Sequence, residues 1–296
     1  MDMLARRQDP SAPLNMPQLL LALSDRHWDK YKCEVSLCRE QFSNEAIRGL
    51  RIASRRMLAL VQLLRMLNLG PNLQNLRCVL KYQMDGFDNL RDIQVVLAEI
   101  SGTVQEIPSL LPFRKYLQKS EKHLLRSVKK KFKQMKPGDT AKRIVKRSEL
   151  LEARIIENIP GRMLQAVDEA FLITQQRLGR VDPSNPDTIH SVRLGFKKFR
   201  YLVEMIHPIL GNFPQENLER MKNYQGAMGA IQDLEILLRT LADFAASAYV
   251  FDPKPALHFY EKRHTETISA YLDEMDALNT FWRTAPDRPF PWEDVP

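Results

Sequence analysis

The sequence predicts an all-α fold, and three observations support this prediction. The 296 residues include only 11 glycines and are rich in Leu, Ala, Gln, Glu, Lys and Arg, which favour helices. Apolar residues recur at intervals of three and four, as on one face of a helix, and no convincing strand alternation is present. One segment also recurs about 140 residues further along the chain. We therefore expect two similar helical halves, each long enough for a four-helix bundle.

Glycine and proline mark the ends of the expected helices. In the first half we expect helices at 17–40, 43–68, 72–85, 87–101 and 108–136, with breaks at Gly70-Pro71 and Gly102. The dipeptide Pro137-Gly138 ends the fifth helix and lies near the boundary between the halves. In the second half we expect helices at 140–178, 187–207, 214–228, 230–248 and 253–281. Their breaks fall in the proline-containing run 182–186, at Gly211 and at Asp252-Pro253.

The chain therefore divides into a flexible N-terminus at 1–14, a first helical half at 15–140, a second at 141–282 and a C-terminal tail at 283–296. The two ends are rich in proline and charge, so we expect them to be poorly ordered or loosely docked. No apolar run approaches the roughly 20 residues that cross a bilayer. Three cysteines without paired spacing suit a reducing compartment better than a disulfide framework. These features favour a cytoplasmic protein without a transmembrane segment.

The net charge of +8 is concentrated in one part of the chain. Lysine and arginine greatly outnumber acids between Arg114 and Arg147, and many of them repeat at alternating intervals of four and three residues. This stripe would run about 30 Å along one face of a helix. Dense positive charge attracts polyanions such as nucleic acid, an anionic membrane or inorganic polyphosphate, whereas a solvated outer face is the alternative interpretation. The stripe consists of Lys115, Lys119, Lys122, Arg126, Lys129, Lys133 and Lys136.

The repeat itself carries two further basic rows. Residues 45–64 read EAIRGLRIASRRMLALVQLL, and residues 187–206 read DTIHSVRLGFKKFRYLVEMI. In each copy an apolar stripe faces the expected core, and the cations follow one residue later, about 100° around the helix. No acid lies among these cations, so an external anion would neutralise them, although an ordinary solvated basic face is also possible. The rows are Arg48, Arg51, Arg55 and Arg56 in the first copy, and His190, Arg193, Lys197, Lys198 and Arg200 in the second.

His190 is open to several interpretations. A metal-binding histidine needs partners such as Cys, His or a carboxylate three or four residues away, but Arg193 and Leu194 occupy those positions. A general base needs an orienting acid and a nearby nucleophile, and neither is visible. His190 is therefore either a structural histidine or an anion contact, and we expect no metal, no cofactor and no catalytic residue.

Four other residues are candidates for supporting roles. Asp92, Asp233 and Glu204 are expected to hold basic side chains in register, unless they form ordinary surface ion pairs. Tyr201 either donates its hydroxyl to a phosphate or packs between bundles.

Several of these segments resemble the CHAD family, the conserved histidine α-helical domain. They are HSVRLGFKKFRYLVE at 190–204, its weaker copy IRGLRIASRR at 47–56, and the segments LRDIQVV and IQDLEIL, which contain Asp92 and Asp233. The resemblance covers roughly residues 17–280. It implies two four-helix bundles related by a pseudo-twofold axis, a basic groove or pore, and binding of inorganic polyphosphate at polyphosphate granules.

One position departs from the family pattern. Arg48 stands where the family usually has a histidine in the first copy. Arginine keeps the positive charge but cannot titrate, so the change disfavours a metal or acid–base role and leaves anion binding intact.

Together these features predict a protein that binds polyphosphate without catalysing a reaction. Nucleic acid is the alternative ligand, as a weaker polyanion, and is disfavoured because no aromatic residues are interleaved in the basic rows. A phosphate-processing enzyme is a further alternative, although no P-loop, carboxylate cluster or nucleophile–base pair is visible. The sequence does not indicate the oligomeric state.

Overall fold

The computed structural model describes residues 16–69, 73–134, 158–248 and 251–293, and these residues form helices without a β-strand. The first half contains α1 (Met16–Glu40), α2 (Asn44–Met66), α3 (Leu73–Asp85), α4 (Asp88–Thr103) and α5 (Leu111–Gln134). The second half contains α8 (Ile159–Leu178), α9 (Pro186–Ile206), α10 (Gln215–Ser247) and α11 (Lys254–Glu274). Short 3-10 helices span Pro108–Leu110, His207–Ile209 and Met275–Thr280. The predicted all-α fold is confirmed.

The two helices of the sequence repeat begin with matching signals. Ser43 precedes α2, and its hydroxyl accepts a hydrogen bond from the Ala46 amide at 3.2 Å. Asn185 precedes α9, and its side chain accepts one from the Asp187 amide at 3.2 Å. Each side chain satisfies an amide that has no partner within the helix. These caps fix where each basic row begins.

Two expected helix boundaries are wrong. A single helix across 140–178 cannot form, because Asn158 has a φ of 52° and caps α8 by accepting a hydrogen bond from the Gly161 amide. Residues 140–157 of that prediction lie outside the described residues. The expected helices at 214–228 and 230–248 are one helix, α10, which continues through Gly229. A helical glycine costs about 1 kcal/mol, and burial of Met228 and Ile231 on one face of α10 offsets that cost.

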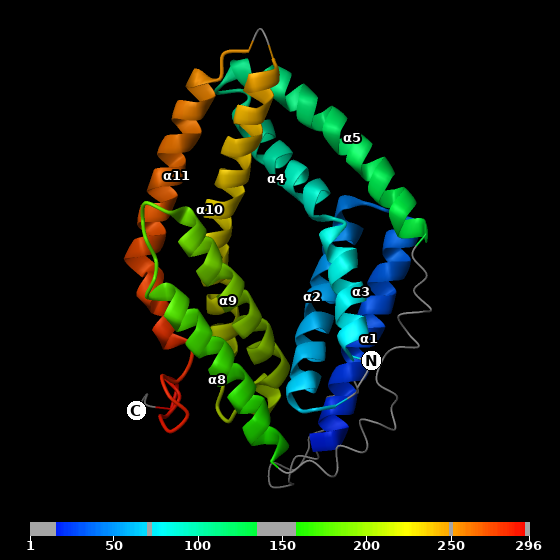
Figure 1. The fold of residues 1–296 in the computed structure, drawn as a ribbon, viewed down its shortest axis with the longest axis vertical. Coiled ribbons are helices and arrows are strands. Elements are labelled where there is room, and N and C mark those ends of the chain that lie inside the picture. Colours follow the sequence, from blue (N-terminus) through cyan, green and yellow to red (C-terminus); the bar gives the residue numbers. More distant parts are fainter. Residues whose placement is uncertain (1–15, 70–72, 135–157, 249–250, 294–296) are drawn as a thin grey trace.

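The apolar core forms two clusters, and neither is confined to one half of the chain. The larger cluster joins α1, α2 and α3 to α8 and α9, with contributions from α5 and α10. The smaller cluster joins α4 and α5 to α10 and α11, at the top of the molecule in Figure 1. Helix α2 packs against α9, and α4 packs against α10. The packing therefore ties the two halves together along their length, while the internal duplication stays a prediction.

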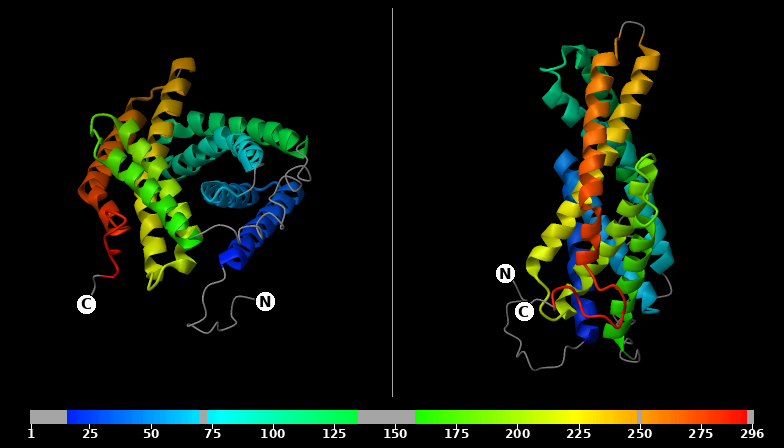
Figure 2. Two further views of the ribbon diagram at one scale, coloured as in Figure 1. Left: turned by 60° about the horizontal axis from the view of Figure 1, so that its bottom comes forward. Right: turned by 90° about the vertical axis from the view of Figure 1, so that its left-hand side faces the viewer.

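The described part of the C-terminal tail packs against the second half, unlike the loose docking expected for it (Figure 2). Trp282 is fully buried, and its ring contacts Phe290 and Trp292. The Trp282 indole donates a hydrogen bond to Asp168 at 2.8 Å, and Arg283 forms an ion pair with the same carboxylate at 2.7 Å. Aromatic burial thus holds a segment that its proline and charge content suggested would be free.

No helix in the described ranges is long and apolar enough to cross a membrane.

Candidate anion-binding site

The two basic rows of the repeat meet where α2 packs against α9. Arg51 and Arg55 come from α2, and Arg193 and Lys197 come from α9. All three guanidinium groups lie close enough to Lys197 to disfavour its protonated form. We call these four residues the α2–α9 cluster. Its formation shows that the rows do not point to separate faces of the molecule.

Lys197 has the strongest electrostatic perturbation in this cluster. Burial and the positive charges of Arg55, Arg193 and Arg51 lower its pKa to about 7, while Asp88 acts weakly in the opposite direction. An ordinary lysine titrates near pH 10.5 and is fully charged at neutral pH. Lys197 therefore titrates near neutral pH, where both its charged and its neutral forms are populated. A bound anion would draw the proton back onto the amine.

Several buried nitrogen atoms in this region lack a hydrogen-bond acceptor. Arg55 Nε, Arg193 Nε and His190 Nδ1 have no partner among the described residues. Burial also lowers the pKa of Arg55, while the nearby Tyr201 hydroxyl raises it. Unpaired buried donors cost roughly 1–3 kcal/mol each, and more when they carry charge. An oxyanion bound between α2 and α9 would satisfy the arginine donors.

Arg51 is committed to contacts inside the protein. It is only 8 % exposed, and its Nη1 donates to Asp88 Oδ1 at 2.8 Å and to the Met84 carbonyl at 3.3 Å. Arg51 therefore fixes the end of α3 and the start of α4. Its positive charge also acts on Lys197. Asp88 was not among the candidates predicted from the sequence. The sequence shows it only as an acid at the first residue of a helix, a common position for an acid in any helix.

A cavity of about 380 Å³ opens between α2, α3 and α9 beside the cluster. We call it the cationic cavity, because five of its lining residues are basic. None of the described residues that line it is acidic. Its apolar wall is formed by Leu58, Ala59, Met84 and Leu194. Its basic residues are Arg55, Arg77, Lys81, Lys197 and Lys198.

Arg77 and Lys81 are the two members of this set that sequence reasoning missed. They lie one turn apart on the exposed side of α3. That spacing was visible in the sequence, but nothing in it showed that α3 borders α2 and α9. Lys198, by contrast, was a candidate, and burial together with Arg177 and Arg77 lowers its pKa against the opposing effect of Glu169.

Arg56 and Arg200 do not join the α2–α9 cluster. Glu204 accepts hydrogen bonds from Arg200 Nη1 at 2.5 Å and from Arg56 Nε at 3.3 Å, and so links α2 to α9. Arg200 is buried and also donates to Gln225 at 2.9 Å. These three charged residues line a separate cleft of about 890 Å³. Glu204 thus holds two arginines in place, but Arg200 is not on the open row expected for it.

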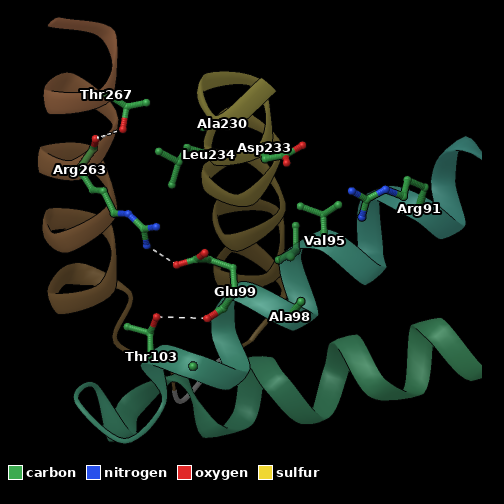
Figure 3. Close-up of a pocket in the computed structure, with 12 residues that line it drawn as sticks. Arg91, Val95, Ala98, Glu99, Thr103, Ala230, Asp233, Leu234, Arg263 and Thr267 are labelled. Atoms are coloured by element: carbon green, nitrogen blue, oxygen red, sulfur yellow. Dashed lines mark hydrogen bonds and ion pairs between the residues drawn. The ribbon is translucent and has the colours of Figure 1, made fainter. Parts of the chain in front are cut away.

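The other two candidate acids lie on α4 and α10. Burial raises the pKa of both Asp92 and Asp233. The charges of Arg91 and Arg193 oppose that shift at Asp233, which places this carboxylate near the α2–α9 cluster. Figure 3 shows Asp233 and Arg91 in a different cavity, of about 520 Å³, where Glu99 forms an ion pair with Arg263. Because that cavity carries both signs of charge, it is a poor candidate for a polyanion site.

His190 lies at the start of the second basic row and is partly buried. Burial lowers its pKa, and Arg193 and Lys197 lower it further. The side chain of Gln232 and the charge of Asp187 act in the opposite direction, so the net effect of the surroundings is to favour the neutral imidazole. No group of three His, Cys, Asp or Glu residues in the described ranges could hold a metal ion. In the first copy, Arg48 is exposed.

The basic stripe on α5 lies apart from the cluster. Its described members are all exposed, and none is among the charges that shift the pKa of Arg55 or Lys197. Helix α5 runs along the outer edge of the molecule (Figure 1). These residues are Lys115, Lys119, Lys122, Arg126, Lys129 and Lys133, and Lys136 lies outside the described residues. The stripe is thus exposed to solvent and lies apart from the cationic cavity.

Two similarities to known proteins agree with this architecture. A family model described as "CHAD domain" matches residues 22–242. The crystal structure of the CHAD domain from the plant Ricinus communis is similar, with a TM-score of 0.67 and 17 % sequence identity over 90 % of each chain. At that identity the similarity shows the fold alone. No functionally curated protein matches the chain.

Proposed function

The chain belongs to the CHAD domain family, and we propose on this premise that it binds inorganic polyphosphate at the α2–α9 cluster and the cationic cavity. The observation that carries the proposal is the meeting of two basic rows without enough acid to neutralise them. Arg51 pairs with Asp88, but among the described residues no ion pair involves Arg55, Arg193 or Lys197. An external polyanion would supply the missing negative charge.

The chemistry of the cluster suits successive phosphate groups. Guanidinium groups donate paired, charge-assisted hydrogen bonds to phosphate oxygens, and ammonium groups act as compact point charges. Arg55 and Arg193 offer buried donors that lack acceptors among the described residues. The exposed stripe on α5 offers a second, weaker surface for a long chain. We propose no catalytic step, and we propose the cytoplasm and polyphosphate granules as the place of binding.

Alanine substitutions test the site. We expect Arg55→Ala, Arg193→Ala and Lys197→Ala each to weaken the binding of long-chain polyphosphate by about tenfold, because each removes a charged hydrogen bond worth roughly 1.5 kcal/mol. Lys262→Ala is the matched control: it also removes one positive charge, but from the exposed face of α11. Affinity is measured by isothermal titration at moderate salt, with circular dichroism to confirm folding. Unchanged affinity in the triple variant would refute the site.

Competition experiments test the ligand. We expect long-chain polyphosphate to displace labelled DNA and RNA at physiological salt, and the reverse displacement to require a large excess of nucleic acid. Binding of either ligand should weaken steeply with salt, since counterion release contributes to both. Tighter binding of nucleic acid would favour the alternative ligand. Release of phosphate from polyphosphate by the purified protein with Mg²⁺ or Mn²⁺ would contradict a purely binding role.

A further inference from the structure

The cationic cavity has an apolar wall that a purely inorganic ligand does not need. Leu58, Ala59 and Leu194 lie beside its basic residues, and Leu194 is 46 % exposed. An inorganic phosphate has no apolar part, so it would leave this apolar wall exposed to water. A small organic phosphate would cover this surface while its phosphate group meets the cations. The cavity therefore suits a ligand with one anionic and one apolar end.

Lys197 places an amine in that cavity under conditions that favour its neutral form. Only about one ordinary lysine in a few thousand is neutral at pH 7, and only the neutral amine is a nucleophile. With its pKa lowered to about 7, Lys197 has a far larger neutral fraction at pH 7 than an ordinary lysine. The charged and titratable groups around it come from four helices. They are Arg51 and Arg55 of α2, Arg77 and Lys81 of α3, Asp88 of α4, and His190, Arg193, Lys198 and Tyr201 of α9.

We propose that Lys197 is a modification site, acylated by small acyl phosphates that bind in the cationic cavity. Arg55 and Arg77 hold the phosphate group, and the acyl group packs against the apolar wall. The Lys197 nitrogen attacks the carbonyl carbon and forms an amide bond. The bond from that carbon to the phosphate oxygen breaks, and inorganic phosphate leaves with its electron pair and takes up the proton that the amine loses.

The modification removes the only titratable charge of the α2–α9 cluster near neutral pH. The acylated nitrogen can no longer be protonated by an incoming anion, so polyphosphate binding should weaken by about the same factor as in Lys197→Ala. This consequence rests on the function proposed above, whereas the acylation itself does not. The two can therefore fail separately.

Reaction of the purified protein with acetyl phosphate at pH 7.5, followed by peptide mass spectrometry, tests the inference. We expect Lys197 to be acetylated at least about tenfold faster than exposed lysines such as Lys119 and Lys122. Its rate should saturate with acetyl phosphate concentration and fall when inorganic phosphate competes. Equal rates at Lys197 and the exposed lysines would overturn the proposal.

Arg77→Gln separates binding in the cavity from mere reactivity of the amine. Arg77 is exposed and lines the cavity, but it is not among the charges that set the pKa of Lys197. We expect this variant to slow acetylation of Lys197 by acetyl phosphate and to leave its reaction with p-nitrophenyl acetate, which has no phosphate group, unchanged. A rate with acetyl phosphate that neither saturates nor responds to Arg77→Gln would overturn the proposal. Polyphosphate binding by the unmodified protein is measured in parallel, so its absence would count against the proposed function alone.

Discussion

Lys197 carries an electrostatic cost that its own surroundings do not relieve. It is partly buried and faces three arginines, and Asp88, the acid that acts on it, already pairs with Arg51. Strongly shifted pKa values tend to gather at functional sites, because folding alone would select against such an arrangement. A bound anion would therefore reduce the repulsion between Lys197 and the three arginines, which the free protein does not neutralise.

Replacing Lys197 with methionine should stabilise the fold most at low pH. The pKa of Lys197 is about 7 in the folded chain and 10.5 in the unfolded chain. Between these values the unfolded chain holds more protons, so this group makes the free energy of unfolding rise with pH. Methionine removes that dependence. We expect Lys197→Met to raise the free energy of unfolding at pH 6 by on the order of 1 kcal/mol, and the gain to shrink towards pH 10.

Urea denaturation at pH 6 and at pH 9 measures this difference. Lys262→Met is the matched control, because that lysine lies on the exposed face of α11, and its substitution should show no such trend. A gain that is equal at both pH values, or that grows with pH, would contradict the expected burial of Lys197 in a basic cluster.

The sequence predicted which residues are basic and on which side of a helix they lie, but not which of them meet. Periodicity assigned Arg55 and Lys197 to equivalent rows, and both line the cationic cavity. The same reasoning placed Arg200 on an open row, whereas Glu204, one turn later, binds it in the interior. Asp88 was out of reach, because its partner Arg51 lies on a different helix and only tertiary packing joins them.

At the scale of the helices, glycines decide how closely neighbouring elements approach. A Cβ atom added at Gly195 would lie 3.0 Å from Thr174 Oγ1, because α8 packs tightly against α9 there. Thr174 is fully buried, and its hydroxyl donates to the Ala170 carbonyl at 2.7 Å, so it has little room to move. Gly226 in α10, by contrast, faces open space.

Alanine at these two glycines should have opposite effects. We expect Gly195→Ala to lower the free energy of unfolding by about 1 kcal/mol or more, because the new methyl group overpacks the α8–α9 contact. We expect Gly226→Ala to raise it by up to about 1 kcal/mol, because alanine favours helix and meets no neighbour. Urea denaturation of both variants measures these changes. Stabilisation by Gly195→Ala would show that α8 and α9 are not in close contact at Thr174.

The sequence predicted most helices well. The predictions failed where the local sequence pattern did not decide whether a helix continues. We expected separate helices at 214–228 and 230–248, but α10 continues through Gly229 because its apolar face is buried against α4 and α9. The reverse occurred at Asn158, where a left-handed residue ends a pattern that periodicity alone would continue. Both outcomes depend on interactions that a local pattern does not contain.

At the scale of the whole molecule, the two halves share their cores. Periodicity shows which face of α4 is buried, but not that α10 covers it. In the smaller cluster, Val96 and Phe113 of the first half pack with Leu237 and Tyr260 of the second. The larger cluster contains residues of both α2 and α9, and this shared packing keeps the α2–α9 cluster together.

A shared core predicts that the halves unfold together. Cys38, which is fully buried in α1, reports on the first half through its reaction with a thiol reagent, once the exposed Cys33 and Cys78 are replaced by serine. Trp282 and Trp292 report on the second half by fluorescence in a Trp28→Phe background. We expect both probes to give the same urea midpoint, since a single cooperative transition exposes both.

Leu237→Ala makes this test decisive, because the substituted residue belongs to the second half and lies in the cluster that both halves share. Leu237 is 1 % exposed, and its truncation should cost roughly 2–5 kcal/mol through lost burial and a new cavity. If the cores are shared, the midpoints of the Cys38 and tryptophan transitions must fall by the same amount. Leu172→Ala is the matched control, because that leucine is 52 % exposed and should shift neither midpoint appreciably. A fall in the tryptophan midpoint alone would mean that each half is a separate folding unit, and the α2–α9 cluster would then depend on docking between two independent domains.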